Sequence, residues 1–374
     1  MKKIRNAVEL SVMCATLVLS LMLCSFVLNR QTSSNELRVR NFYREQADSL
    51  DVVLVGSSLF YNGYSAPLAW KEGGYTSYVL ATSGVPMGVI KSMVKEVRRT
   101  QDPKAILIDL NSVIYDEQME TREGMIRYWI DNMPDSENKE EVIRELIPEE
   151  EQITYRIPLL KYHDNWKQLL PCLKLSMLEL RAQWSGENLV TMGMQTSTKH
   201  PKQRKLKSVH GYTKQKELHS LSGRRFQELL DYLKEENVDH AVFVAMPKFY
   251  DDKHLQDREL LNRAMDMARK AGFRVYDFDV QTETIGLDPY HDYFDYDHLN
   301  LFGQQKMTRF LIKRLKQDFD LKREYDHAAK IRWEKEYDSY TKLFSWFQQR
   351  WLAEETMNAN YKNIDEIIDT GGDR

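Results

Sequence analysis

The first apolar run after the amino-terminal region is found in the segment Asp51-Val52-Val53-Leu54-Val55-Gly56-Ser57-Ser58. Four consecutive apolar residues, most of them β-branched, are followed by a glycine and two serines. Such a run is typical of a buried β-strand that ends in a turn. The sequence therefore predicts a strand whose carboxyl end lies near Gly56, with Ser58 in the turn that follows it.

Predicted strands and helices alternate along the chain after this first strand. Apolar runs predict buried strands, and apolar positions three or four residues apart predict helices. The predicted strands are 105–110, 241–245 and 273–278, and the predicted helices are 87–100, 223–236, 254–271 and 302–316. This alternation predicts an α/β domain with a mainly parallel sheet. Sheets of this kind place their functional sites at the carboxyl ends of the strands.

Two regions interrupt the alternation. Residues 112–217 form a predicted insertion with aromatic and charged helical segments, which we expect to lie above the carboxyl edge and cover part of the site. Residues 317–374 form a charged tail in which aromatic residues recur at helical spacing. The predicted organisation is an anchor over 1–30, a linker or juxtamembrane helix over 31–50, an α/β domain over 51–316 that contains the insertion, and the helical tail.

The amino terminus has the pattern of a membrane anchor. Between Glu9 and Arg30 lie 20 residues without a charge, and about 20 helical residues span the roughly 30 Å hydrocarbon core of a bilayer. One alternative is a cleaved signal peptide, whose apolar region is usually about 7–15 residues and ends at a small-residue cleavage site. The apolar segment here is longer and has no convincing cleavage site. A buried helix of a soluble protein is the other alternative.

Charge predicts the orientation of this anchor. Lys2, Lys3 and Arg5 precede the apolar segment and favour a cytoplasmic amino terminus. A long carboxy-terminal domain can cross the membrane largely regardless of its charge. We therefore expect a single-pass protein of the cell membrane, with residues 31–374 outside the cytoplasm.

Composition excludes several classes of protein. The chain has 374 residues, of which 42% are hydrophobic and 29% charged, which permits a large core and excludes a disordered chain. A net charge of -3 is not that of a nucleic-acid-binding polycation, so no nucleic-acid partner is expected. Three cysteines, two of them in the apolar segment, cannot build a disulfide framework. The spacing of His, Cys and Asp residues predicts no metal site, and we expect no cofactor.

Three residues are candidates for nucleophilic catalysis. Ser58 follows the first strand, where the amino terminus of a helix favours developing negative charge. The alternative is a serine that only caps this helix. Asp295 and His298 lie three residues apart before the last predicted helix, so that one turn lets the carboxylate orient the imidazole that a serine nucleophile requires. Asp297 competes for this orienting role, but adjacent side chains usually point in different directions, and we therefore favour Asp295.

Together these segments resemble the SGNH/GDSL hydrolases. Gly56-Ser57-Ser58-Leu59 resembles the Gly-Asp-Ser-Leu block, with Ser57 replacing the aspartate, and Asp295-Tyr296-Asp297-His298 matches the Asp-x-x-His block. Ala81-Thr82-Ser83-Gly84 fits the block whose glycine N–H joins the oxyanion hole. The family's Gly-x-Asn-Asp block corresponds to Asp109-Leu110-Asn111-Ser112, which has no glycine and leaves Asn111 as the candidate donor. The resemblance covers roughly residues 50–112 and 218–316.

This resemblance implies a fold and an activity. The fold would be an SGNH-like, flavodoxin-like three-layer sandwich. Ser58 would be the nucleophile, His298 the base and Asp295 the group that orients it, and Gly84 and Asn111 would form the oxyanion hole. A serine in place of the aspartate is similar to membrane-anchored members that modify cell-envelope polymers, such as the D-alanyl transfer protein of teichoic-acid modification and alginate O-acetylation proteins.

The implied function is that of an extracytoplasmic serine acyltransferase or esterase. Its acceptor would be a cell-surface polysaccharide or a teichoic-acid-like polymer, and a membrane-bound O-acyltransferase would be the partner that passes the acyl group across the membrane. The alternative is a non-catalytic, membrane-anchored binding or assembly factor of an envelope acyltransfer complex.

Overall fold

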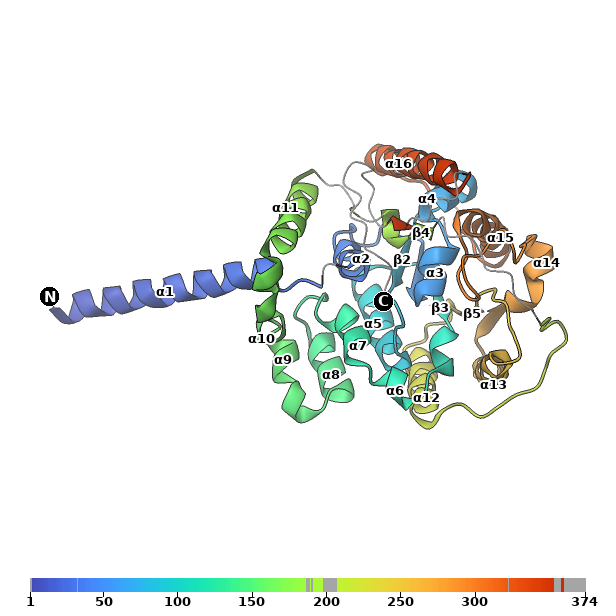
Figure 1. The fold of residues 1–374 in the computed structure, drawn as a ribbon, viewed down its shortest axis with the longest axis horizontal. Coiled ribbons are helices and arrows are strands. Elements are labelled where there is room, and N and C mark those ends of the chain that lie inside the picture. Colours follow the sequence, from blue (N-terminus) through green and yellow to red (C-terminus); the bar gives the residue numbers. More distant parts are fainter. Residues whose placement is uncertain are drawn as a thin grey trace.

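A five-stranded parallel sheet forms the centre of the molecule (Figure 1). The computed structural model describes residues 2–31, 33–185, 189, 191–197, 207–321, 323–352 and 358–359. The strands are β1 (Val52–Gly56), β2 (Ser77–Ala81), β3 (Ala105–Asp109), β5 (Ala241–Ala245) and β6 (Arg274–Asp277). Their order is β2-β1-β3-β5-β6, and all neighbours are parallel. This is the strand order of the flavodoxin-like doubly wound sheet, and it confirms the predicted α/β fold.

Helices cover both faces of the sheet and make three layers. On one face, α15 (Leu301–Asp318) packs against α3 (Ser58–Gly63) and η1 (Ala69–Gly73), next to α4 (Ala66–Leu68). Right-handed crossovers place α5 (Met87–Thr100), α12 (Ser220–Glu235) and α13 (Leu255–Lys270) on the other face, where α5 and α12 pack together. The helices predicted for these segments are confirmed to within a few residues.

The strand β2 was not predicted from the sequence. Only Val79, Leu80 and Ala81 form an unbroken aliphatic run there, and so short a run does not distinguish a strand from a buried helical turn. The strand is nevertheless buried along its whole length, although it lies at the end of the sheet. The cause is the segment that precedes the sheet in sequence, which covers this edge.

That segment, predicted as a linker or a juxtamembrane helix, forms helix α2 (Ser34–Phe42). The hydroxyl of Ser33 accepts the N–H of Glu36 and caps the helix. The helix packs against β2 and against η5 (Thr191–Gly193), and nearly all of its residues are buried. It is therefore part of the body of the protein and closes an exposed sheet edge.

The predicted insertion contains most of the remaining helices. They are α6 (Glu117–Glu120), α7 (Glu123–Ile130), α8 (Glu137–Leu146), α9 (Ile153–Arg156), α10 (Leu159–Tyr162) and α11 (Leu169–Ser185), with the 3₁₀ turns η2 (Asn111–Ile114), η3 (Glu149–Glu151) and η4 (His163–Gln168). Contrary to the expectation that the insertion lies above the site, α8 packs beside the sheet on α5, and α11 packs on the amino-terminal helix. Met125 of α7 does reach the carboxyl edge, where its side chain lies next to the position that a Cβ atom on Gly84 would take.

The carboxy-terminal part continues the three-layer body. It adds η6 (Asp279–Gln281), α14 (Thr282–Ile285), α16 (His327–Leu352) and β7 (Asn358–Ala359), which pairs antiparallel with β4 (Thr196–Ser197) of the insertion. Helix α16 packs on α4, η1 and α15, as expected for an aromatic helical tail. The predicted tail also includes residues 353–357 and 360–374, which lie outside the described residues.

The amino-terminal helix α1 (Lys2–Leu28) projects away from the body (Figure 1). Its segment Ile4–Leu28 is long and apolar enough to cross a membrane, and none of its most apolar window is buried inside the protein. In the described part of the chain it is the one helix with these properties. A membrane anchor at this position is consistent with the structure.

Two helical glycines provide a test of the packing around α15. A Cβ atom added to Gly303 would overlap the backbone carbonyl of Asp292, whereas a Cβ atom added to Gly124 in α7 would have no heavy atom within 4 Å. Alanine favours a helix over glycine by about 1 kcal/mol. We expect Gly124→Ala to leave the free energy of unfolding unchanged or raised, and Gly303→Ala to lower it by about 1–3 kcal/mol. Denaturant unfolding of the full chain in detergent measures both; equal effects would contradict the packing described here.

Candidate active site

The structure brings together the three residues that were predicted to carry catalysis. Ser58 begins α3 directly after β1, whereas Asp295 and His298 lie in the loop before α15. The Oγ atom of Ser58 is 2.7 Å from Nε2 of His298. On the other side of the ring, Nδ1 of His298 is 2.8 Å from Oδ2 and 3.0 Å from Oδ1 of Asp295. The three side chains therefore form one continuous serine–histidine–aspartate arrangement.

The conformation of the loop places Asp295, and not Asp297, in position to orient the His298 imidazole. The Oδ1 atom of Asp295 accepts the backbone N–H of His298 at 2.7 Å and that of Asp297 at 2.9 Å, so the carboxylate closes one turn of the chain. The side chain of Asp297 is directed elsewhere, with Oδ1 3.7 Å from Nζ of Lys248. The ring of Phe294 stacks on the imidazole with a centroid distance of 5.2 Å and fixes its plane. This is the arrangement that the proposed orienting role of Asp295 requires.

Burial and charge act in opposite directions on the imidazole. Burial disfavours the imidazolium, but the hydrogen bond and charge of Asp295, with the charge of Asp297, outweigh burial and raise the pKa of His298 above its ordinary value. For Asp295, burial acts in the raising direction on the pKa, because it disfavours the ionised carboxylate. The bonds of Asp295 to His298 outweigh burial and lower the pKa of Asp295. With a proton on Nδ1 shared with an ionised Asp295, Nε2 is left to accept the Ser58 proton. The His298 side chain is still 21% exposed, so a substrate can reach it.

A buried carboxylate holds the turn that presents Ser58. Asp109 ends β3, and its Oδ2 atom accepts the backbone N–H of Ser57 at 3.2 Å and also the Ser57 hydroxyl. Its Oδ1 atom accepts the N–H of Asn111 at 2.9 Å. Burial raises the pKa of Asp109, and these donors oppose that shift. A side chain at Gly56 would overlap Asp109, which explains the glycine at the end of β1.

The role of Asp109 was not predicted from the sequence. Its signal was present: a carboxylate at the end of an otherwise apolar strand, where burial requires hydrogen-bond donors. Ser57, which stands where the resembled family has aspartate, is one of these donors. Its hydroxyl oxygen also accepts the N–H of Leu59 at 3.3 Å and so caps α3.

The two predicted oxyanion-hole residues follow the strands on either side of β1. Gly84 follows β2 and has a φ of +56°, a backbone conformation that favours glycine. Asn111 follows β3; its Oδ1 accepts a hydrogen bond from Nζ of Lys248, and its Nδ2 lies 3.4 Å from the Tyr115 hydroxyl. Both residues therefore lie at the same edge of the sheet as Ser58. Their role as donors to an oxyanion stays a prediction.

Helix α2 holds the loop that contains Gly84. The side-chain oxygen of Asn35 accepts the N–H of Ser83 at 2.9 Å and a guanidinium N–H of Arg38 at 3.0 Å. The same guanidinium donates to the carbonyl of Ala81 at 3.2 Å. A segment that was predicted from its polarity to be a linker or juxtamembrane helix thus positions a loop of the candidate site. Sequence spacing gave no signal of this contact, because it joins residues more than 40 positions apart.

Lys248 is a further residue whose role was not predicted from the sequence. It follows β5 by three residues and is only 5% exposed. Burial alone would lower its pKa, but the charges of Asp297, Asp279 and Asp109 outweigh burial and raise it, so the ammonium group stays charged. Its hydrogen bond to the Asn111 oxygen turns the amide nitrogen of Asn111 away from the lysine. A lysine directly after Pro247, at the carboxyl end of a buried strand, was the available signal.

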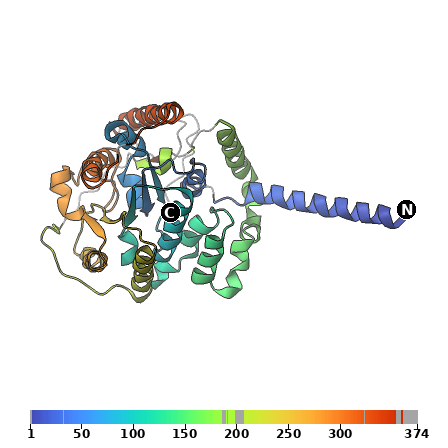
Figure 2. The ribbon, with the colours of Figure 1, turned by 180° about the vertical axis from the view of Figure 1, so that it is seen from behind.

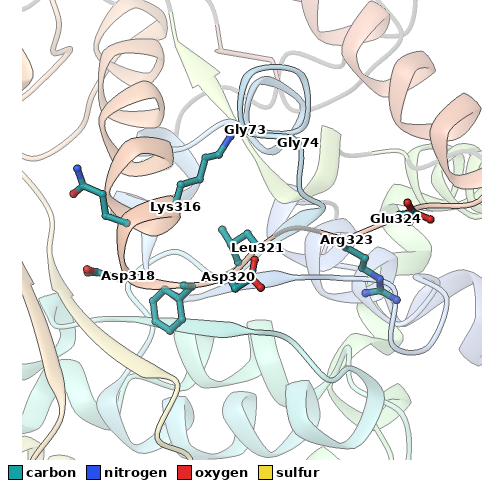
Figure 3. Close-up of a pocket in the computed structure, with 10 residues that line it drawn as sticks. Gly73, Gly74, Lys316, Asp318, Asp320, Leu321, Arg323 and Glu324 are labelled. Atoms are coloured by element: carbon teal, nitrogen blue, oxygen red, sulfur yellow. The ribbon is translucent and has the colours of Figure 1, made fainter.

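A hollow of the molecule lies at the opposite, amino edge of the sheet. It has a volume of about 700 Å³ and is formed by the end of α15, the segment after it and the turn at Gly73 and Gly74 (Figure 3). None of the candidate residues lines it. Within the described part of the chain, no group of three or more His, Cys, Asp or Glu side chains is placed to hold a metal ion.

Comparisons with known proteins give only distant similarities. No protein-family model and no curated protein sequence matches the chain. Among solved structures, a lipase/acylhydrolase from Enterococcus faecalis shows 10% identity and a TM-score of 0.34, over 73% of this chain and 98% of that protein. A gut microbial diltiazem-metabolizing enzyme shows 11% identity and a TM-score of 0.35, over 71% of this chain and 47% of the other.

A third similar structure is an active-site mutant of a family two carbohydrate esterase from Clostridium thermocellum. It shows 8% identity and a TM-score of 0.29, over 73% of this chain and 65% of that protein. Similarity of this extent establishes neither a shared family nor a shared activity. The case for a function therefore rests on the residues of the site.

The raised pKa of His298 can be measured directly. In an NMR titration of the full chain in detergent, with the His298 signal assigned by its loss in His298→Gln, we expect a pKa above the ordinary value of about 6.5. Asp295→Asn should lower this pKa, because it removes the negative charge bonded to Nδ1. Asp297→Asn should lower it less, since Asp297 does not bond to the ring. A pKa unaffected by Asp295→Asn would contradict the described geometry.

Proposed function

We propose that this chain is an SGNH-type serine esterase or acyltransferase. The observation that carries the proposal is the contact of Ser58 Oγ with one imidazole nitrogen of His298, while Asp295 binds the other. A nucleophile, a base and a group that orients the base are the three parts of serine acyl-transfer chemistry. Their position at the carboxyl edge of a doubly wound sheet supports the same conclusion, as does the resemblance of their sequence blocks to the SGNH/GDSL hydrolases.

The geometry supports a two-step reaction. In the first step, His298 Nε2 takes the Ser58 proton while Oγ attacks the acyl carbonyl carbon, and His298 then gives that proton to the leaving oxygen as the ester bond breaks. In the second step, His298 takes a proton from water or from an acceptor hydroxyl, whose oxygen attacks the acyl-serine. The Ser58 oxygen leaves with the proton held by His298, and the free enzyme is restored. Water gives an esterase, and a polymer hydroxyl gives a transferase.

Negative charge on the carbonyl oxygen requires donors during both steps. The backbone N–H groups of Ser58 and Gly84 and the side-chain amide of Asn111 would supply them. Lys248 supports this assignment, because its bond to the Asn111 oxygen leaves the amide nitrogen as the end that can face a substrate. The amino terminus of α3 adds its dipole at the same position.

The location and the substrate follow from the anchor and from the family resemblance. The body would lie outside the cytoplasm, attached through α1, and would act on a cell-surface polysaccharide or a teichoic-acid-like polymer. A membrane-bound O-acyltransferase would be the partner that supplies the acyl group. The alternative, a non-catalytic assembly factor of an acyltransfer complex, predicts that Ser58 is dispensable in cells.

Substitution of the three candidate residues tests the proposal. We expect Ser58→Ala and His298→Ala each to lower the rate of p-nitrophenyl acetate cleavage by the full chain in detergent by about 10³-fold or more. Asp295→Ala should be less damaging, because Asp295 orients the base and does not exchange the proton. The double variant Ser58→Ala/His298→Ala should be no slower than either single variant, since the residues act as a unit.

Two variants serve as matched controls for this assay. Asp297→Ala removes a neighbouring carboxylate that does not contact the ring, and Ser339→Ala removes a hydroxyl that bonds to the carbonyl of Lys335 in its own helix. Both should retain most of the activity. An inactive Asp297→Ala beside a normal Asp295→Ala would overturn the assignment of the orienting residue. Full activity of Ser58→Ala in this assay would overturn Ser58 as the nucleophile. Full function of Ser58→Ala in cells would overturn the enzyme in favour of the assembly factor.

The oxyanion role of Asn111 has a test of its own. We expect Asn111→Ala to lower kcat by about 10²–10³-fold with little change in KM, because the lost donor acts on charge that develops in the transition state. Tyr115→Phe is the control, since it removes the hydroxyl next to the amide but keeps the amide itself. Equal kcat in wild type and Asn111→Ala would leave the oxyanion to backbone donors alone.

A further inference from the structure

Exposed apolar side chains are concentrated in one part of the body. Outside α1, 13 large hydrophobic side chains of the described residues are exposed, and ten of them lie between residues 153 and 184. They are Ile153, Ile157, Leu160, Trp166, Leu169, Leu170, Leu173, Met177, Leu180 and Trp184. We call this set the α9–α11 patch. Single exposed apolar residues are ordinary on soluble proteins, but a large group of them in one region is typical of a surface that contacts a membrane or another protein.

Helix α11 shows that the patch has a defined face. The outward side chains Leu170, Leu173, Met177, Leu180 and Trp184 follow one another at intervals of three or four residues. The inward side chains are Cys172, Leu175, Ser176, Glu179 and Ala182, all buried against the protein. A surface helix of a soluble protein has the reverse arrangement, with its apolar stripe turned to the core and its polar face turned to water. The outward face of α11 is thus suited to an apolar surrounding.

The end of α1 packs against the elements that carry the patch. The side-chain amide of Asn165 donates to the carbonyls of Leu28 and Arg30 at 2.8 and 2.7 Å, and α11 packs directly on α1. In Figures 1 and 2, α9, α10 and α11 form a row along the side of the body from which α1 projects, and α1 runs roughly perpendicular to that row. If α1 crosses a bilayer, a row perpendicular to it lies in the plane of the bilayer surface.

The junction between α1 and the patch is held by buried charges. The guanidinium of Arg30, which is 2% exposed, donates to Glu36 of α2 at 2.7 Å and to Glu179 of α11 at 2.6 Å. It also donates to the hydroxyl of Ser176 at 3.1 Å. Breaking such a buried network would leave charges without partners, which is strongly unfavourable. The end of α1 is therefore fixed to both helices instead of being a loose tether.

We propose that the α9–α11 patch lies in the surface of the same lipid bilayer that α1 crosses, with its apolar side chains at the boundary of the acyl chains. Trp166 and Trp184 fit this position, since tryptophan is enriched at membrane interfaces. Lys174, exposed beside the outward stripe, can extend its ammonium group to the lipid headgroups. The proposal rests on α1 as a membrane span and is independent of the proposed catalysis.

Such contact fixes how the body faces the membrane. The patch is joined to α2 through Arg30, and α2 covers the β2 edge of the sheet. The β2 edge therefore faces the bilayer. The loop before Gly84, which Asn35 and Arg38 hold, belongs to the same rigid connection. The candidate site then has a set orientation toward the membrane, as an enzyme that acts close to lipid would need.

Nitroxide accessibility tests this proposal in a membrane. The full chain, with its native cysteines replaced by alanine, is placed in nanodiscs of phosphatidylcholine and phosphatidylglycerol and labelled at Leu173→Cys or Met177→Cys. The matched control is Ile331→Cys on α16, an apolar side chain 57% exposed, compared with 62% for Met177. We expect both patch labels to be relaxed more by oxygen than by a water-soluble nickel complex, and the control label to show the reverse. A chain that retains only Cys14, in α1, reports whether the anchor is inserted.

A second variant removes the apolar face without disturbing the fold. Leu170 and Trp184 are 78% and 91% exposed, so Leu170→Glu/Trp184→Glu should leave the melting temperature unchanged. In this double variant, we expect the label at Met177→Cys to be relaxed more by the nickel complex and less by oxygen. Ile331→Glu should leave the relaxation of that label unchanged.

Three results would overturn the proposal. In the first, Cys14 reads as inserted while the patch labels behave like the Ile331→Cys control, so that α1 crosses the bilayer but the patch stays in water. In the second, the patch labels show dipolar broadening that disappears on dilution with unlabelled chain, which assigns the patch to contact between two copies. In the third, Cys14 itself reads as aqueous, and the anchor fails together with the patch. None of these measurements depends on catalytic activity, so failure of the membrane-contact proposal can be distinguished from failure of the proposed function.

Discussion

The carboxylate of Asp109 is the constraint on which the candidate site depends. It is fully buried at the end of a central strand, where an ionised group needs donors on both oxygens. The donors are the backbone and hydroxyl of Ser57 and the backbone of Asn111. The same carboxylate thus fixes the turn after β1 and the turn after β3. The nucleophile candidate and one oxyanion candidate are positioned together, because they share one buried partner.

His298 contacts Ser58 from the loop before α15, and buried polar side chains hold this loop as well. Asn300 caps α15 by accepting the N–H groups of Phe302 and Gly303, and its amide donates to the carbonyl of His291. Asp292, buried within the loop, accepts the ammonium of Lys306 at 2.6 Å. Side chains on both ends of the loop thus tie it to the start of α15. Asp295 then needs to orient only the ring of His298, since the backbone around it is already held.

Local sequence patterns predicted those parts of the structure that are determined by residues close together in the sequence. Most strands of the sheet follow from apolar runs, and the pairing of Asp295 with His298 follows from a separation that closes one turn. The meeting of Ser58 with His298 could be predicted only through the family resemblance and the rule that sites gather at one sheet edge, because 240 positions separate them. The strand β2 was missed because its aliphatic run, Val79 to Ala81, is too short to distinguish a strand from a buried helical turn.

Contacts between distant segments could not be predicted in this way. The buried ammonium of Lys248 contacts Asn111 across 137 positions, and nothing in either local sequence indicates that pairing. The same holds for Arg30 and Glu179, which join the end of α1 to α11. Burial makes these charged groups depend on their partners, yet a sequence of polar residues does not show which of them will be buried. Arg30 connects α1 with α2 and α11, and Lys248 holds Asn111 within the candidate site.

Covalent labelling tests directly whether Ser58 is a nucleophile that His298 activates. The full chain in detergent is treated with a fluorophosphonate, which reacts with activated serines, and the modified peptide is identified by mass spectrometry. We expect one phosphonylated serine, Ser58 and not the adjacent Ser57, and loss of labelling in both Ser58→Ala and His298→Ala. Absence of labelling in the folded wild-type chain, or labelling that persists at the same rate in His298→Ala, would contradict it.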